Sequence, residues 1–141
     1  MTIERIIEGH QDILTCPVTA SVQEAATLLA DRRIGALPVM DGERIAGIFS
    51  ERDVLYRLRE FGAEVLSMPV RDVMTTPAVT VEPSTSAMTA LAMMTKRRIR
   101  HLPVVDRGRM IGFVSIGDIV KYRIDKVEGE AAAMRDYIQM A

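Results

Sequence analysis

The sequence has little that would support a disulfide, a metal cage or a membrane anchor. It contains one cysteine, two histidines and no tryptophan, and aromatic residues make up 4% of its 141 residues. A lone Cys16 cannot form an internal disulfide, and so few cysteines and histidines cannot build a cysteine/histidine zinc site. No stretch approaches the roughly 18 uncharged apolar residues of a transmembrane helix. The N-terminal segment carries Glu4 and Glu8 and has no long apolar core, which excludes a secretory signal. We therefore expect a cytoplasmic protein without a membrane partner.

The charge balance excludes the basic excess that is typical of nucleic-acid binders. Lysine and arginine together number 18 against 19 aspartates and glutamates, for a net charge of −1. One short basic run, residues 96–101, has no stacking aromatic beside it, and we interpret its first three cations as a solvated helix end. Hydrophobic residues make up 48% of the chain, enough for a buried core.

An internal repeat dominates the chain. Residues 13–55 and 78–120 align without a gap at an offset of 65, with 14 identities in 43 pairs. In each copy a short extended piece precedes an amphipathic helix, which has a capping-box signal at Ser21 and Glu24 in the first copy. Two strand-like runs joined by an Asp-Gly or Asp-Arg-Gly turn follow, and then a second helix begins at Ser50 or Ser115. Each unit is therefore predicted to be β-α-β-β-α.

One such unit has too little area to bury, so we expect the two to pack sheet to sheet. The fold class is α/β (α+β), with a pseudo-twofold axis between the units. We assign residues 1–60 to the first unit and residues 61–126, which include a packed linker at 61–73, to the second. A separate C-terminal helix follows at 127–141, and its partly apolar face is expected to pack on its own module or on a second subunit.

The segments 33–41, 47–53, 98–106 and 112–118 carry a resemblance to a known family. They read Arg-Ile-Gly-Ala-Leu-Pro-Val-Met-Asp, Gly-Ile-Phe-Ser-Glu-Arg-Asp, Arg-Ile-Arg-His-Leu-Pro-Val-Val-Asp and Gly-Phe-Val-Ser-Ile-Gly-Asp. In this order they resemble tandem cystathionine-β-synthase (CBS) domains, the pair called a Bateman module, and most of all the stand-alone bacterial pairs. The resemblance implies a regulatory module that binds an adenine nucleotide such as AMP, ADP, ATP or NAD(H), and sometimes S-adenosylmethionine.

The repeated pattern Gly-h-h-Ser-x-x-Asp, where h is apolar, has two interpretations. A carboxylate on the first turn of a helix can accept both hydroxyls of a ribose, while the free N–H groups of the helix start favour an anion. Alternatively, Ser50 with Asp53 and Ser115 with Asp118 simply cap their helices. Prolines 38 and 103 lie in predicted strands and indicate a strand edge or start.

The resemblance also implies that each ribose-binding aspartate faces the base pocket of the other unit. Site one would combine Ser50, Arg52 and Asp53 with Thr75, Pro77, Val79, Ile99, Arg100, His101, Leu102 and Pro103. Site two would combine Ser115, Gly117 and Asp118 with Asp12, Leu14, Ile34, Gly35, Ala36, Leu37 and Pro38. Site one has Arg52, Arg100 and His101 where site two has Gly117, Gly35 and Ala36, so site one is the better phosphate site.

Several function classes compete with a nucleotide sensor. The sequence contains no Walker-type loop, Gly-x-Gly-x-x-Gly fingerprint or Cys/His nucleophile pair, so we expect neither an enzyme nor a catalytic cofactor or metal. An adaptor module with inactive nucleotide pockets is the main alternative. Apolar helix faces predict a homodimer in which two modules form a disc, and the downstream protein partner is not named by the sequence.

Overall fold

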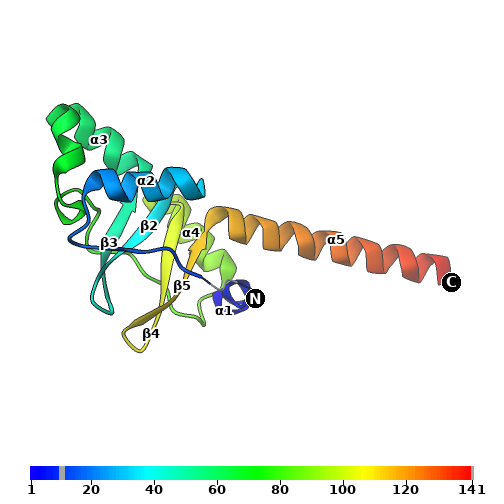
Figure 1. The fold of residues 1–141 in the computed structure, drawn as a ribbon. Helices are drawn as coiled ribbons and strands as arrows, with labels where there is room; N and C mark the ends of the chain where they lie inside the picture. The colour runs from blue at the N-terminus through cyan, green and yellow to red at the C-terminus, as the bar shows by residue number, and fades with distance from the viewer. Residues whose placement is uncertain (10–11, 141) are drawn as a thin grey trace.

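The two repeats fold as two units of the same design, as the computed structural model of residues 1–9 and 12–140 shows (Figure 1). The first unit contains β1 (Cys16–Pro17), α2 (Val22–Arg32), β2 (Ala36–Asp41), β3 (Arg44–Ser50) and α3 (Glu51–Phe61). The second contains α4 (Ala87–Arg97), β4 (His101–Asp106), β5 (Arg109–Ser115) and α5 (Ile116–Met140). A short helix α1 (Ile3–Ile7) precedes them, and the 3-10 helices η1 (Gly62–Ser67) and η2 (Val70–Asp72) join them.

The first helix of each unit begins and ends in the same way. The Ser21 hydroxyl oxygen accepts a hydrogen bond from the Glu24 N–H at 3.1 Å, and Ser86 accepts one from Thr89 at 3.0 Å. Both helices end on an arginine in the left-handed region, with φ of 53° at Arg33 and 56° at Arg98. Glycine is the usual residue at this position because an L side chain is strained there.

Each unit contributes a small sheet, and the two sheets contact each other through β3 and β5. The first sheet has the order β1-β2-β3, with β1 parallel and β3 antiparallel to β2. In the second, β4 and β5 form an antiparallel hairpin, and Val81 bridges to Val104 in the parallel sense. The first strand that we expected in this unit is thus reduced to an isolated bridge. This arrangement confirms the predicted fold of two mixed helix-and-strand units packed sheet to sheet.

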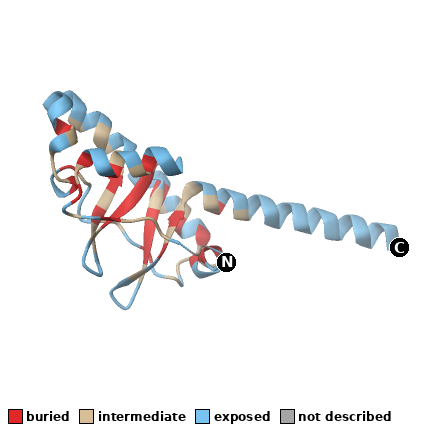
Figure 2. Ribbon diagram, in the orientation of Figure 1, coloured by how far each residue is buried: buried red, intermediate tan, exposed pale blue. Residues whose placement is uncertain are grey.

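The two hydrophobic cores do not follow the division at residue 60. The core of the first unit includes Val65, Val70 and Val73 of the linker, and the core of the second includes Ile3 and Ile7 of α1 (Figure 2). The segment that leads into each unit therefore packs on the other unit. The linker is packed, as the sequence predicts, but its apolar side chains are buried against the first unit. This exchange ties the two units together.

Helix α5 is one continuous helix rather than two. We expected a break after Asp125 and a separate helix at 127–141, and this prediction is wrong. No proline interrupts residues 116–140, so nothing ends the helix there. Ile119 is buried and Tyr122 packs on the core of the second unit, whereas every residue from Arg123 to Met140 is exposed. The helix projects from the body as a rod (Figures 1 and 2), so it does not pack on its own module. Ala141 lies outside the described residues. Over the described part of the chain, no helix combines the length and apolar character needed to cross a membrane.

Candidate functional site

One cavity, which we call cavity one, has a volume of about 670 Å³ and lies between the two units. The first unit contributes the end of β3 and the start of α3, and the second contributes the segments before and after α4. The lining residues are Gly35, Ala36, Ile48, Ser50, Glu51, Arg52, Asp53, Tyr56, Thr75, Pro77, Ala78, Val79, Arg97, Arg98, Ile99, Arg100, His101, Ser115, Ile116 and Gly117. Small-molecule sites have volumes of about 300 to 1,000 Å³, so the cavity is large enough for a nucleotide-sized ligand.

Asp53 lies in the wall of cavity one, on the first turn of α3. Its Oδ2 accepts hydrogen bonds from the Ser50 N–H at 2.9 Å and the Ser50 hydroxyl at 3.2 Å. Its Oδ1 accepts a third from the Thr75 hydroxyl at 3.0 Å. Burial raises the pKa of Asp53, while these hydrogen bonds and Arg57 oppose the shift. A carboxylate has about four acceptor positions, so Asp53 caps its helix and still has acceptor capacity toward the cavity.

Gly47 explains how Thr75 reaches Asp53. The backbones of Ile48 and Thr75 exchange hydrogen bonds of 3.0 and 2.8 Å, which places the 74–76 segment directly over β3. A Cβ atom at Gly47 would lie 2.7 Å from the Thr75 carbonyl oxygen and 2.8 Å from the sulfur of Met74. Only a residue without a side chain permits this approach, so the glycine of the repeated motif shapes the cavity wall.

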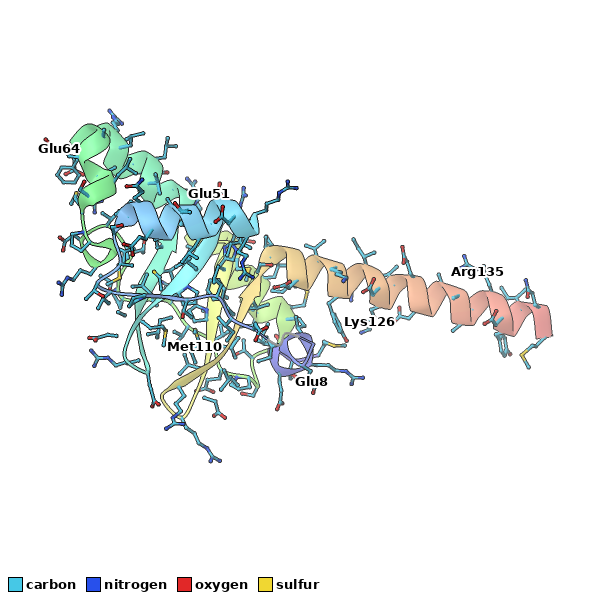
Figure 3. The ribbon with its side chains drawn as sticks, in the orientation of Figure 1. Glu8, Glu51, Glu64, Met110, Lys126 and Arg135 are labelled. Atoms are coloured by element: carbon cyan, nitrogen blue, oxygen red, sulfur yellow. The ribbon has the colours of Figure 1, made fainter. Side chains whose placement is uncertain are left out.

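Four arginines line cavity one: Arg52, Arg97, Arg98 and Arg100. The Arg52 guanidinium donates to the Arg98 carbonyl oxygen at 2.6 Å and so links α3 of the first unit to the end of α4 in the second. Glu51 and Asp53 are the carboxylates in the same wall (Figure 3 labels Glu51). Guanidinium groups are the preferred partners of phosphate, so the lining suits an anionic ligand.

His101 lies where cavity one meets a second, smaller cavity, and it lines both. Its ring stacks on Phe113 with centroids 5.3 Å apart and planes 15° apart. Burial lowers the pKa of His101, and Arg100 adds to this shift, whereas Asp118 and Glu51 oppose it. The imidazole is therefore neutral at pH 7 and can both donate and accept a hydrogen bond.

The second cavity, cavity two, has a volume of about 540 Å³. It is lined by Asp12, Ile13, Leu14, Arg32, Arg33, Ile34, Gly35, Ala36, His101, Phe113, Ser115 and Asp118. The Asp118 Oδ2 accepts from the Ser115 N–H at 2.8 Å, and the Ser115 hydroxyl oxygen accepts from the Asp118 N–H at 3.1 Å. The capping interpretation therefore describes both motif aspartates in this structure, and it leaves the ligand interpretation open.

The cavities bring together most of the predicted site residues, in the crosswise manner that the resemblance implies. Cavity one contains the site-one residues Ser50, Arg52, Asp53, Thr75, Pro77, Val79, Ile99, Arg100 and His101. Cavity two contains the site-two residues Asp12, Leu14, Ile34, Gly35, Ala36, Ser115 and Asp118. Each cavity thus joins the aspartate of one unit to a loop of the other.

Some predicted residues lie elsewhere. Leu37, Pro38, Leu102 and Pro103 are buried within β2 and β4 and line neither cavity, and Leu37 and Leu102 belong to the cores. Gly117, which we assigned to site two, lines cavity one instead. Pro38 lies on the middle strand β2, just before the point where β1 begins to pair, so its missing N–H costs no ladder bond there.

The sequence analysis did not predict that the arginine pairs ending α2 and α4 line the cavities. Arg97 and Arg98, interpreted as a solvated helix end, line cavity one, and Arg32 and Arg33 line cavity two in the same way. Tyr56 of α3 and Phe113 of β5 were also missed. The arginine pair recurs at the same place in both copies, immediately before the loop of each site, and that recurrence was the available signal.

Comparison with known proteins agrees with the repeat. The profile of the CBS domain matches residues 5–60 and 70–125. The mitochondrial CBS domain-containing protein CBSX3 of Arabidopsis thaliana is 36% identical over 131 residues, which cover 89% of this chain and 64% of that protein. This chain therefore spans less than two thirds of the length of that relative.

Solved structures show the same architecture. A CBS-domain-containing protein of Agrobacterium tumefaciens is 34% identical with a TM-score of 0.83, and the match covers 87% of this chain and 99% of that one. The structure of CBSX2 in complex with AMP is 27% identical with a TM-score of 0.75, and the match covers 88% and 96%. The neighbours extend over both units and over the cavities between them.

Proposed function

The chain belongs to the CBS-domain family, and we propose that it is a cytoplasmic regulatory module that binds an adenine nucleotide in cavity one. The candidates are AMP, ADP, ATP and NAD(H). The observation that carries the proposal is the single cavity that joins Asp53 of the first unit to the arginines of the second. A related protein with 27% identity, CBSX2, has been solved with AMP, which supports this ligand class.

Asp53 and Thr75 would hold the ribose. The Thr75 hydroxyl already donates to Asp53 at 3.0 Å, and a ribose hydroxyl can use the remaining acceptor position or take the place of this donor. In either case the ligand contacts both the start of α3 and the 74–76 segment. A ligand without a ribose diol would lose the hydrogen bond to Asp53.

The arginines at the end of α4 would hold the phosphate. Arg98 keeps a left-handed backbone, with φ of 56° and ψ of 41°, at a position where glycine would be unstrained. Strained residues of this kind cluster at binding sites, where the side chain has a role that offsets the strain. Arg52 and Arg100 lie in the same wall, so a phosphate can be reached from both units.

The apolar part of the cavity would receive the base. Ile48, Val79 and Ile99 line it and are half-buried, so each keeps part of its side chain available for an aromatic ring. Tyr56, one turn after Asp53 on α3, adds an exposed ring at the same rim.

Binding across two units provides a signal without chemistry. A ligand that touches both the first and the second unit favours the arrangement in which they bind it best, and it shifts the population toward that arrangement. Helix α3 begins at the cavity and exposes Leu55, Leu58 and Phe61 to solvent. We assign this apolar face to a homodimer contact, so the ligand can alter the dimer, and a downstream protein would respond to that change.

Thermal unfolding against a ligand panel tests the proposal. The panel is AMP, ADP, ATP, NAD, NADH, S-adenosylmethionine and adenosine, the last of which lacks phosphate. A ligand at 100 times its Kd stabilises the native state by about 2.7 kcal/mol, which raises Tm by about 5 to 10 °C for a chain of this size. We expect a shift with at least one nucleotide and a smaller shift with adenosine.

Matched variants locate the site. Asp53→Asn keeps a carbonyl acceptor for the cap at Ser50 but removes the charge that favours the ribose diol, and Asp118→Asn makes the same change in cavity two. We expect Asp53→Asn to abolish the shift and Asp118→Asn to preserve it. The reverse pattern would move the site to cavity two, and no shift with any ligand would favour an adaptor with inactive pockets.

A further inference from the structure

The exposed part of helix α5 has a heptad pattern. Apolar residues recur at alternating steps of four and three: Val120, Ile124, Val127, Ala131, Met134 and Ile138. In heptad letters, positions 124, 131 and 138 are a, and positions 120, 127 and 134 are d. We call this stripe the α5 seam, and a 3.5-residue period of this kind is the signature of a coiled coil.

The seam faces away from the body of the molecule. Tyr122 and Gly129 both occupy the f position, opposite the seam, and Tyr122 packs on the core of the second unit. In the seam itself Ile124 is 51% exposed and Ile138 is 65% exposed. The seam is therefore accessible along the projecting rod (Figure 3, where Lys126 and Arg135 mark two of its turns).

The projecting segment lacks the contacts that keep a helix stable. Residues 123–140 extend for about 27 Å at about 1.5 Å per residue, and all of them are exposed. Isolated helices of this length are marginal in water, and Gly129 lowers the helix propensity further. A partner on the seam would supply the missing stabilisation.

Charges beside the seam identify that partner as a second copy of the chain. Over residues 123–140, position g carries Arg123, Glu130 and Tyr137, and position e carries Glu128 and Arg135. In a parallel, in-register pair, each g residue faces the e residue five positions later in the other helix. Arg123 then faces Glu128 and Glu130 faces Arg135, so every such pair is of opposite charge.

We propose that the α5 seam forms a parallel, in-register two-stranded coiled coil with a second copy of this chain. The proposal rests on the homodimer of the proposed function and specifies its orientation: the second units of the two copies lie at the same end of the coil. It makes no use of the nucleotide, so ligand binding can fail without affecting it.

The first test compares seam and outer-face variants by light scattering. Val127→Glu with Met134→Glu places two charges at d positions, whereas the control Ala132→Glu with Gln139→Glu places two charges at b positions with the same spacing. We expect the wild type and the control to have about twice the 15.7 kDa mass of one chain. The seam variant keeps the α3 contact, so it should still pair, but at least about tenfold more weakly than the wild type.

Charge reversal distinguishes parallel from antiparallel pairing. Arg123→Glu alone should lower the dimer affinity by about two- to fivefold for each affected pair. The new carboxylate at position 123 then faces the like charge of Glu128 in the other copy. Adding Glu128→Arg restores opposite charges in the parallel coil and should rescue affinity. In an antiparallel coil, where g faces g and e faces e, the second change adds repulsion with Arg135 and rescue fails.

Cysteine cross-linking completes the test. Ile138→Cys should form a disulfide between two copies under mild oxidation, because identical a positions meet only in a parallel register; Asp136→Cys, at f, should not. The wild type, whose Cys16 is buried, provides the background. A seam variant that dimerises as tightly as the wild type, together with no cross-link in Ile138→Cys, would overturn the coil but leave the α3 dimer. A monomeric wild type would overturn both.

Discussion

Replacing Arg98 with glycine should separate stability from ligand binding. Arg98 ends α4 with φ of 56° and ψ of 41°, in the left-handed region. That conformation costs an L residue roughly 1 to 2 kcal/mol, whereas glycine adopts it freely but loses about 0.5 to 1 kcal/mol to its larger unfolded-state entropy. The balance predicts that Arg98→Gly stabilises the fold by about 0.5 to 1 kcal/mol, or about 1 to 4 °C in Tm.

The same change should weaken nucleotide binding. Arg98 lines cavity one, and a hydrogen bond to a charged group contributes about 1.5 to 3 kcal/mol when it is well buried. Because Arg98 is exposed, we expect about 1.4 kcal/mol, which corresponds to a tenfold rise in the Kd of AMP. The Arg98 carbonyl that accepts from Arg52 remains in the variant, so that contact between the units is preserved.

Arg33→Gly is the matched control. Arg33 ends α2 with a similar backbone, φ of 53° and ψ of 46°, but it lines cavity two. The Arg33→Gly variant should therefore be stabilised by the same amount without a change in AMP affinity. Thermal unfolding and isothermal titration calorimetry on both variants check the two quantities. If Arg98→Gly left AMP affinity unchanged, or Arg33→Gly reduced it by as much, the role assigned to Arg98 would be refuted.

Three further outcomes follow from the geometry. Gly47→Ala should displace the 74–76 segment, because a Cβ would lie 2.7 Å from the Thr75 oxygen, and calorimetry should show weaker AMP binding with a lower Tm. Burial lowers the pKa of His101, so its neutral form stabilises the fold above pH 6.5, and that contribution is lost as pH falls toward the folded pKa. Between pH 7.5 and pH 5.5, denaturant unfolding should show a larger loss of unfolding free energy in the wild type than in His101→Gln. Burial raises the pKa of Cys16 to about 11, so a thiol reagent at pH 8 should label it only after unfolding, and rapid labelling of the native protein would contradict its burial.

The internal repeat made the fold predictable. Periodicity located both amphipathic helices and both hairpins, since each signal occurs twice at a constant offset of 65. The partners of the connecting segments could not be predicted in this way, because apolar residues such as Ile3 and Val70 fit either core equally well. Likewise, the lack of a stop signal near Asp125 indicates that α5 continues, but no local signal shows that it leaves the body, since helix propensity alone does not say what a helix packs against.

The candidate site was partly predictable for the same reason. The motif serines and aspartates line cavities together with residues of the opposite unit, as the resemblance implies. Leu102 and Pro103 were included because the resemblance places them at the base pocket. Successive residues of a strand point to opposite faces, so the burial of both shows that β4 is covered on its two faces there. Arg98 was overlooked because a cation at a helix end has a sufficient explanation in the helix dipole, and only the structure shows that it borders the cavity.

Isothermal titration of AMP into the wild type, Asp53→Asn and Asp118→Asn tests the central claim most directly. We expect the wild type and Asp118→Asn to bind AMP with similar affinity at one site per chain, and Asp53→Asn to lose that binding while it remains folded by circular dichroism. Binding that survives in a folded Asp53→Asn but disappears in Asp118→Asn would contradict the assignment of the nucleotide to cavity one.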